Sequence, residues 1–171
     1  MDESWGGLTA DEIIEVWDGQ VRPIPSEAIA TAVSSETRRL LTEVGLPTVR
    51  LLGSSFVFDD RLSNTKSQDG HDYLVLTDEP YLRSFALDTR TDEVVEFDQR
   101  DAAHTRFVNT DLATLIFFLG RLWRAVNSDT NAEALAALDE IRSALSTFDP
   151  AAMEEGAPWW LRLDDLESQI R

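Results

Sequence analysis

The chain has 171 residues, of which 32 are acidic and 15 are basic, and its formal net charge at pH 7 is −17. Hydrophobic residues make up 43% of the sequence, which is too many for a disordered acidic tail and predicts a single folded domain over residues 1–171. A surface this acidic repels phosphate backbones and anionic lipids but attracts cationic proteins. The composition therefore argues against nucleic acid or membrane as a partner and favours a basic protein.

The chain contains no cysteine, which excludes disulfides, thiolate metal ligands and a thiol nucleophile, and which is typical of a reducing compartment. Residues 1–4 include Asp2 and Glu3, whereas a signal peptide begins with basic residues and continues into an apolar run. The longest apolar stretch, residues 112–120, is well short of the ~20 residues that cross a bilayer. We therefore expect a cytoplasmic protein without a membrane segment.

Two helices are predicted near the N-terminus. The first begins at a capping box formed by Thr9 and Glu12 and ends at Asp18-Gly19. Two prolines, at positions 23 and 25, then require an extended connector because they lack amide donors and restrict the residues before them. The second helix is predicted over residues 35–44, with Gly45 in the left-handed conformation that ends many helices.

The middle of the chain has the character of strands. Short β-prone runs at residues 51–52 and 56–58 are followed by a polar segment, residues 59–72, that we expect to be an exposed loop. Further strands are predicted at residues 73–76, 82–87 and 93–97, and the last two flank a hairpin turn at residues 88–92. This order predicts a mainly antiparallel sheet between residues 51 and 108.

Helices follow the sheet. Asn109 or Thr110 is expected to cap a strongly apolar helix that continues to Val126. Another helix is predicted over residues 132–147, and Pro158 suits the first turn of a last one. The residues expected on one apolar side of the 132–147 helix are Leu135, Leu138, Ile141, Leu145 and Phe148. The predicted fold class is thus α+β: a single domain with N-terminal helices, a central mainly antiparallel sheet, and C-terminal helices packed on it.

Several of these features occur together in one known group of proteins. The first helix carries Trp17, the connector holds Pro23-Ile24-Pro25, residues 37–47 read TRRLLTEVGLP, and a strand enters Phe56-Val57-Phe58. In this combination the chain resembles the SUKH superfamily of bacterial immunity proteins, with its Smi/Knr-like fold. The strand-to-helix motif Phe107-Val108-Asn109-Thr110 is similar to one clade of that superfamily. The resemblance is clearest over residues 10–127, and the C-terminal helices of residues 128–171 fit it more loosely.

The resemblance implies a binding protein rather than an enzyme. It implies an immunity protein that protects its own cell by neutralising a cognate polymorphic toxin, often a nuclease or a nucleic-acid deaminase. It implies no catalytic residue, cofactor or metal.

The residues themselves leave two alternatives open. His71 and His104 have Asp69, Asp72 and Asp101 near them in sequence, which suggests a two-imidazole metal site and, with it, a small metal-dependent hydrolase. Neither histidine belongs to a metal-binding spacing, however, and loop histidines beside acids are more often solvated. The second alternative is a regulatory or scaffold module of the same fold that binds an endogenous protein.

The favoured hypothesis is a monomeric protein that occludes the basic substrate site of a toxin. Carboxylates can stand where the phosphates of the substrate would lie, because a toxin that acts on nucleic acid must be basic there. Trp5 precedes any predicted element, so we expect it to be exposed and to serve as an anchor. The candidate partner-binding acids are Asp59, Asp60, Asp78, Glu79, Asp98 and Asp101.

Overall fold

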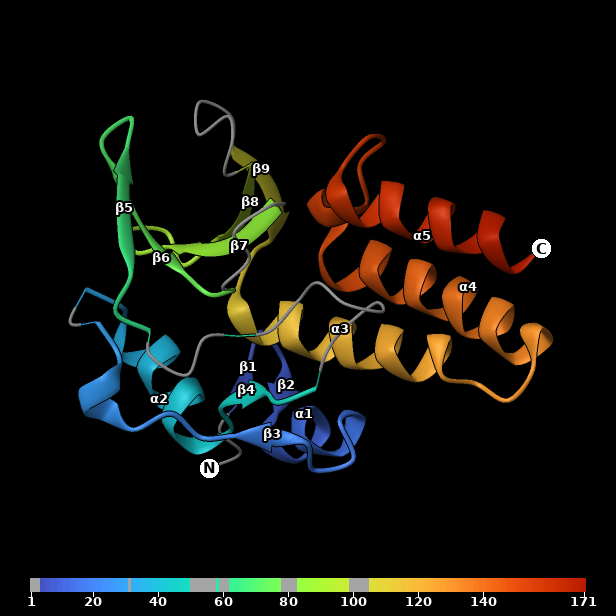
Figure 1. Ribbon diagram of the computed structural model, residues 1–171, viewed down its shortest axis with the longest axis horizontal. Helices are drawn as coiled ribbons and strands as arrows, with labels where there is room; N and C mark the ends of the chain where they lie inside the picture. Colours follow the sequence, from blue (N-terminus) through green and yellow to red (C-terminus); the bar gives the residue numbers. More distant parts are fainter. Residues whose placement is uncertain (1–3, 31, 50–57, 59–61, 78–82, 99–104) are drawn as a thin grey trace.

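The computed structural model describes residues 4–30, 32–49, 58, 62–77, 83–98 and 105–171. Short N-terminal elements and a five-stranded sheet are followed by three long helices that lie side by side (Figure 1). The predicted α+β fold class is confirmed. The predictions for residues 51–52, 56–57 and 59–61 fall outside the described residues.

The N-terminal part is built from short paired segments and two helices. The strands β1 (Ser4–Trp5) and β2 (Leu8–Thr9) form a hairpin that leads directly into α1 (Ala10–Val16). The predicted capping box is present, with the Thr9 side chain accepting from the amide of Glu12 and the Glu12 side chain accepting from the amide of Thr9. The connector is extended as predicted, and it includes a strand, β3 (Val21–Arg22), that pairs with β4 (Leu46–Pro47).

The second helix lies between these two strands in sequence. It is α2 (Ser35–Glu43), preceded by the short turn η1 (Ser26–Ala28). Gly45 has a φ of 90°, and a Cβ atom at this position would lie 1.9 Å from the carbonyl oxygen of Arg22. The predicted left-handed glycine is therefore confirmed, and the β3–β4 pairing depends on it.

The sheet is an antiparallel meander in which each strand pairs with the next along the chain. Its strands are β5 (Thr65–Gln68), β6 (His71–Val75), β7 (Arg83–Asp88), β8 (Val94–Asp98) and β9 (Thr105–Asn109). The loop expected over residues 59–72 is wrong at residues 65–68 and 71–72, which belong to strands. Asp69 and Gly70 both have positive φ, so they form the tight turn of a two-residue hairpin, and the polar segment before them is an edge strand.

The C-terminal half consists of α3 (Leu112–Val126), α4 (Asn131–Phe148), the short turn η2 (Pro150–Met153) and α5 (Pro158–Ile170). Asp111 caps α3 by accepting from the amide of Thr114. The expectation that Asn109 or Thr110 caps this helix is wrong, because Asn109 still belongs to the sheet. Pro158 occupies the first turn of α5, as predicted. No helix in the described segments is long and apolar enough to cross a membrane.

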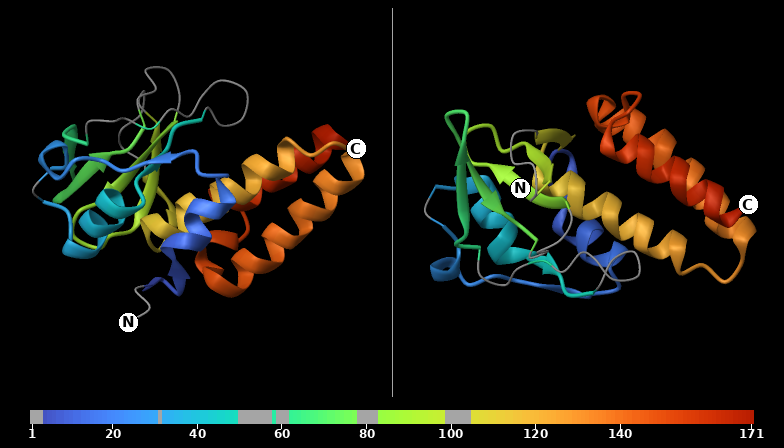
Figure 2. Two further views of the ribbon diagram at one scale, coloured as in Figure 1. Left: turned by 90° about the horizontal axis from the view of Figure 1, so that it is seen from below. Right: turned by 45° about the horizontal axis from the view of Figure 1, so that its top comes forward.

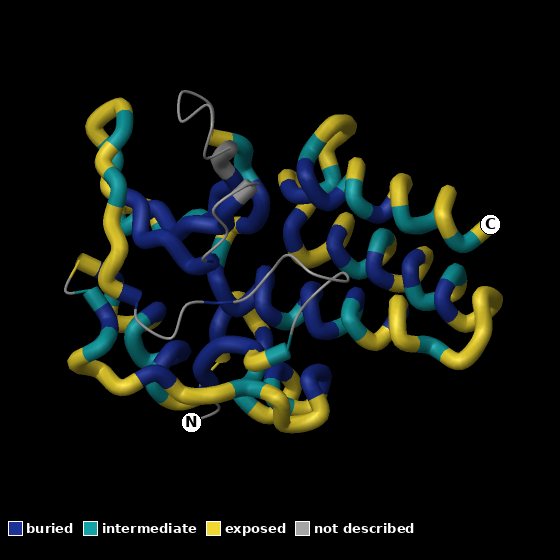
Figure 3. Tube along the Cα trace, viewed as in Figure 1, coloured by how far each residue is buried: buried dark blue, intermediate teal, exposed yellow. Residues whose placement is uncertain are grey.

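The helices cover one face of the sheet. Leu74, Phe85 and Leu87 belong to the main core together with the buried residues of α3 (Figure 3). Successive side chains of a strand point to opposite faces, and the intervening residues form a second, smaller cluster. Its members are Tyr73, Val75, Ala86 and Val95.

A buried polar network joins the sheet to the C-terminal helices. The side-chain amide of Asn109 donates to Asp149 over 3.0 Å, and the indole of Trp159 donates to the Asn109 oxygen over 2.8 Å. Thr110 donates to Asp149 through both its amide and its hydroxyl. Because Asn109 and Trp159 are fully buried, these bonds fix the position of α5 relative to the last strand.

Candidate functional site

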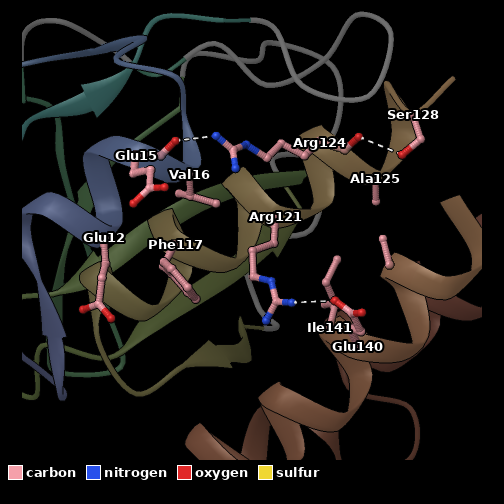
Figure 4. Close-up of a pocket in the computed structure, with 11 residues that line it drawn as sticks. Glu12, Glu15, Val16, Phe117, Arg121, Arg124, Ala125, Ser128, Glu140 and Ile141 are labelled. Carbon is pink, nitrogen blue, oxygen red and sulfur yellow. Dashed lines mark hydrogen bonds and ion pairs between the residues drawn. The ribbon is translucent and has the colours of Figure 1, made fainter. Parts of the chain in front are cut away.

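α1 lies against α3 on the side away from α5 (Figure 2). A groove is lined by side chains of α1, α3 and α4 (Figure 4). Its volume is about 390 Å³. The lining residues are Glu12, Glu15, Val16, Phe117, Arg121, Arg124, Ala125, Ser128, Ala137, Glu140 and Ile141. The groove thus has one wall from the N-terminal helix and two from helices more than a hundred residues further along the chain.

A close contact between α1 and α3 places the first wall. Trp17 donates from its indole nitrogen to the carbonyl of Ile116 over 3.0 Å and stacks on Trp123 at a centroid distance of 5.8 Å. Gly120 faces this contact, and a Cβ atom there would lie only 2.6 Å from a methyl group of Val16. The absence of a side chain at Gly120 lets the two helices approach.

The two arginines of the groove are engaged within the chain. Arg124 donates to the backbone carbonyl of Glu15 over 2.6 Å and also to the carboxylate of Asp18. Arg121 donates to Glu140 over 3.2 Å. Figure 4 shows both guanidinium groups turned towards these acceptors. The positive charges in the groove are therefore already matched by acceptors of the same chain.

Two carboxylates on α1, unlike the two arginines, are not fully engaged by the described residues. One oxygen of Glu12 accepts from the amide and the hydroxyl of Thr9, each over 2.8 Å. The bond from the Thr9 backbone, followed by that from its hydroxyl, holds the pKa of Glu12 below its ordinary value, so this group is ionised at neutral pH. Within the described part of the chain, the carboxylate of Glu15 has no hydrogen bond or ion pair. Both groups lie one turn apart on the same wall.

The floor of the groove is apolar. Phe117 is half-buried between Val16 and the facing side chains of α4, which are Ala137 and Ile141. The spacing of residues 137, 141, 144 and 148 places them on one face of α4, and this face ends in Phe148, which is 52% exposed. Phe148 was expected on the same apolar side as Leu138, Ile141 and Leu145, and it differs from these three in not being buried.

Comparison with known protein families identifies the chain. A family model described as SUKH-4 immunity protein matches residues 5–165. The chain belongs to the SUKH-4 immunity protein family. This family consists of immunity proteins and not of enzymes, and membership implies a cognate toxin as partner. Searches of curated proteins and of solved structures gave no match.

The match covers more of the chain than the residues over which the resemblance is clearest in the sequence. The SUKH-4 model continues beyond residue 127 through α4 and most of α5. The C-terminal helices are thus part of the family domain, in agreement with the buried network around Asp149.

Trp5 lies elsewhere in this SUKH-4 chain, and the expectation that it is exposed is wrong. It is only 3% exposed, donates to the carbonyl of Glu36 over 3.3 Å, and has the guanidinium of Arg39 4.8 Å from its ring centroid. A small cavity of about 140 Å³ lies beside it, lined in part by Asp92 and Asp111. Asp92 accepts from Thr37 and Asp111 caps α3, so both aspartates have structural roles. The burial of Trp5 and its contacts with α2 make it a packing residue.

Of the predicted acidic patch, the structure describes one member. Asp98 is the last residue of β8, where its backbone pairs with that of Arg83. The other members, Asp59, Asp60, Asp78, Glu79 and Asp101, lie outside the described residues. Their convergence on one face stays a prediction.

His71 of the SUKH-4 chain has a structural partner. Its Nδ1 lies 2.5 Å from a carboxylate oxygen of Asp88, and its ring stacks on Tyr73. Asp88 also accepts from the amide of Arg90. His104 lies outside the described residues, and among those described no group of three acids or histidines is placed to hold a metal ion.

Sequence reasoning missed the groove. Asp11, Glu12 and Glu15 lie within α1 and Asp18 follows its end, and this cluster was a visible signal of an acidic face. The partners across the groove come from α3 and α4, and no local pattern indicates which face of a distant helix will meet α1.

Proposed function

We propose that this SUKH-4 chain neutralises a toxin that acts on nucleic acid, and that it does so by covering the basic substrate site of that toxin. The observation that carries the proposal is the net charge of −17 on a member of an immunity family. A nuclease or nucleic-acid deaminase needs a basic surface for phosphates, and the immunity protein offers carboxylates of the opposite sign. The candidate acids of the sheet loops, from Asp59 to Asp101, are the side chains proposed to stand in for phosphates.

The same charge favours rapid capture. Unsteered proteins associate at roughly 10⁵ to 10⁶ M⁻¹s⁻¹, and complementary surfaces raise this rate by orders of magnitude at low salt. A cell that must inactivate an incoming toxin before it acts benefits from that speed. Slow release would then depend on a few desolvated anchor residues.

Co-expression with the toxin domain encoded next to the gene of this chain tests the proposal. We expect restored growth, co-purification of the two proteins, and inhibition of nucleic-acid cleavage or deamination by the purified toxin domain. A neighbouring toxin that is neutralised but attacks membranes or cell wall would overturn the nucleic-acid assignment and leave the immunity role intact.

A further inference from the structure

We propose that the groove between α1, α3 and α4 is a docking site for a basic segment of the cognate toxin. An apolar side chain of this segment enters the groove, and flanking Lys or Arg side chains contact Glu12 and Glu15. The inference rests on the toxin partner of the proposed function, but it does not depend on the acids of the sheet loops.

The shape of the site supports an inserted side chain. A groove of about 390 Å³ has room for several waters, since one water needs only about 10–15 Å³ on this measure. Those over the apolar floor at Phe117 and Ala137 find few polar partners. Replacing poorly ordered waters by an apolar group increases affinity.

The apolar surface extends beyond the groove. The face of α4 that supplies Ala137 and Ile141 continues to Phe148, and Phe148 is the most exposed of the large apolar side chains in the described residues. Half-exposed aromatic side chains in such positions are typical anchors of interfaces. A toxin segment can therefore follow α4 from the groove towards the end of the helix.

The charges select the sign of the occupant. Arg121 and Arg124 are held by Glu140, by Asp18 and by the carbonyl of Glu15, so an anionic ligand would have to displace these bonds. The carboxylate of Glu15 and one oxygen of Glu12 have no partner among the described residues, and both side chains line the groove (Figure 4). A cationic segment gains new ion pairs at no such cost.

The overall charge argues against a second copy as the occupant. Two chains that each carry a net charge of −17 repel one another. A basic toxin has the opposite preference.

Two groove variants and one matched control test the site against the neighbouring toxin domain, with binding followed by surface-immobilised kinetics. E12Q/E15Q removes two charges but keeps an acceptor for the capping box, because Gln serves there as Glu does. A137M fills the groove from α4 with a good helix former. The control, E154Q/E155Q, makes the same charge change, from −17 to −15, in the exposed turn between η2 and α5.

We expect E12Q/E15Q to slow association and A137M to speed dissociation, each raising Kd by roughly tenfold. The control should stay within about threefold of the parent, since it alters only the long-range field. Melting temperatures identify any variant that is merely misfolded. Hydrogen exchange of the unmodified chain is a second readout, with protection expected in α1 and the second half of α3 on toxin binding.

Each outcome has a distinct meaning. If the parent binds and both groove variants bind like the control, or if α1 and α3 gain no protection, the docking site is overturned while the proposed function stands. If sedimentation shows that the groove variants change self-association and not toxin binding, the groove is an interface between copies and the inference is wrong. A parent that does not bind the toxin overturns the function and the docking site together.

Discussion

Individual polar residues hold the SUKH-4 fold together where apolar packing alone would leave orientation open. Asn109 is the clearest case, because it sits at the end of β9 with no solvent contact and still has its side-chain oxygen and nitrogen bonded, to Trp159 and Asp149. This explains the strand-to-helix motif at residues 107–110 physically. The motif places two polar side chains, those of Asn109 and Thr110, where they bind the C-terminal helices.

The first prediction concerns this residue. Asn109→Ala leaves the indole of Trp159 without its acceptor and removes one donor from Asp149, and each unsatisfied buried group costs about 1–3 kcal/mol. We expect the free energy of unfolding in urea to fall by roughly 2–4 kcal/mol. Asn127→Ala, at an exposed position after α3, should change it by less than about 1 kcal/mol. Equal effects of the two substitutions would contradict the role of the network.

Tyr73 gives the protein a pH dependence in the alkaline range. Burial is the largest cause that raises the pKa of Tyr73 above its ordinary value of 10.0, and a hydrogen bond with Thr105 opposes it. The carboxylates of Asp88, Asp69 and Glu93 raise the pKa of Tyr73 further. The folded state therefore keeps the phenolic proton longer than the unfolded state does. Stability from this group is fully present below about pH 10 and is lost as the pH rises through the folded pKa.

The second prediction is that Tyr73→Phe flattens this decline. The chain has a single lysine and two tyrosines, so few other groups titrate in the same range. Urea unfolding at a series of pH values above neutrality should give a smaller loss of stability for the variant than for the parent. Parallel curves for the two proteins would show that Tyr73 does not control the alkaline response.

At the scale of elements, helix contacts decide what the local sequence leaves open. The capping box of α1, the helices at 35–44 and 132–147, and the hairpin at 88–92 follow from local signals, and the structure has them close to the predicted positions. Strand β5 was missed because its sequence, TKSQ, lacks the alternation of apolar and polar residues that marks a strand. The alternation is absent because β5 lies at the edge of the sheet and buries no side chain. The Asp-Gly turn after it was the available signal.

Trp5 and the groove were missed for a different reason. The hairpin of β1 and β2 has only two residues in each strand, so its existence depends on the packing of Trp5 against α2. Likewise, Phe117 and Glu15 line the same groove only because α1 packs against α3. Such contacts are tertiary, and a single sequence carries no local pattern for them.

The third prediction tests this helix contact. Gly120→Ala adds a methyl group 2.6 Å from Val16 and 2.9 Å from the Trp17 indole nitrogen. Overpacking of this kind costs typically about 1–3 kcal/mol, which exceeds the gain of about 1 kcal/mol that alanine brings to a helix. We expect a lower melting temperature for Gly120→Ala, whereas Ser143→Ala on the exposed side of α4 should have little effect. A stabilised Gly120→Ala variant would mean that α1 lies further from α3.

At the scale of the whole molecule, charge and fold have separate roles. The apolar core and the buried network fix the arrangement of sheet and helices. Among the acids whose burial the structure describes, only Asp88, Glu96 and Asp149 are buried. Substitutions of exposed acids away from packed features usually change stability by no more than about 0.5 kcal/mol. Binding and folding can therefore be separated experimentally.

The fourth prediction uses this separation. Changing Asp59, Asp60, Asp78, Glu79, Asp98 and Asp101 to Asn or Gln should slow association with the toxin domain and weaken its dependence on salt, because screening acts over about 8 Å at physiological ionic strength. The melting temperature should stay near that of the parent. Parental association rates at both low and high salt would show that these acids are only a solvated surface, and would leave the groove as the recognition site.

The capping box of α1 has a consequence for how recognition can diverge among related immunity proteins. The carboxylate of Glu12 accepts from Thr9, so any replacement other than Gln weakens the start of the helix, whereas the carboxylate of Glu15 makes no bond to the described residues, where Glu15 is held only through its backbone carbonyl. A lineage that meets a new toxin can therefore change position 15 without loss of stability, while position 12 stays acidic or amidic. The wall of the groove thus combines one position at which the fold restricts substitution, Glu12, with one at which substitution depends on the partner alone, Glu15.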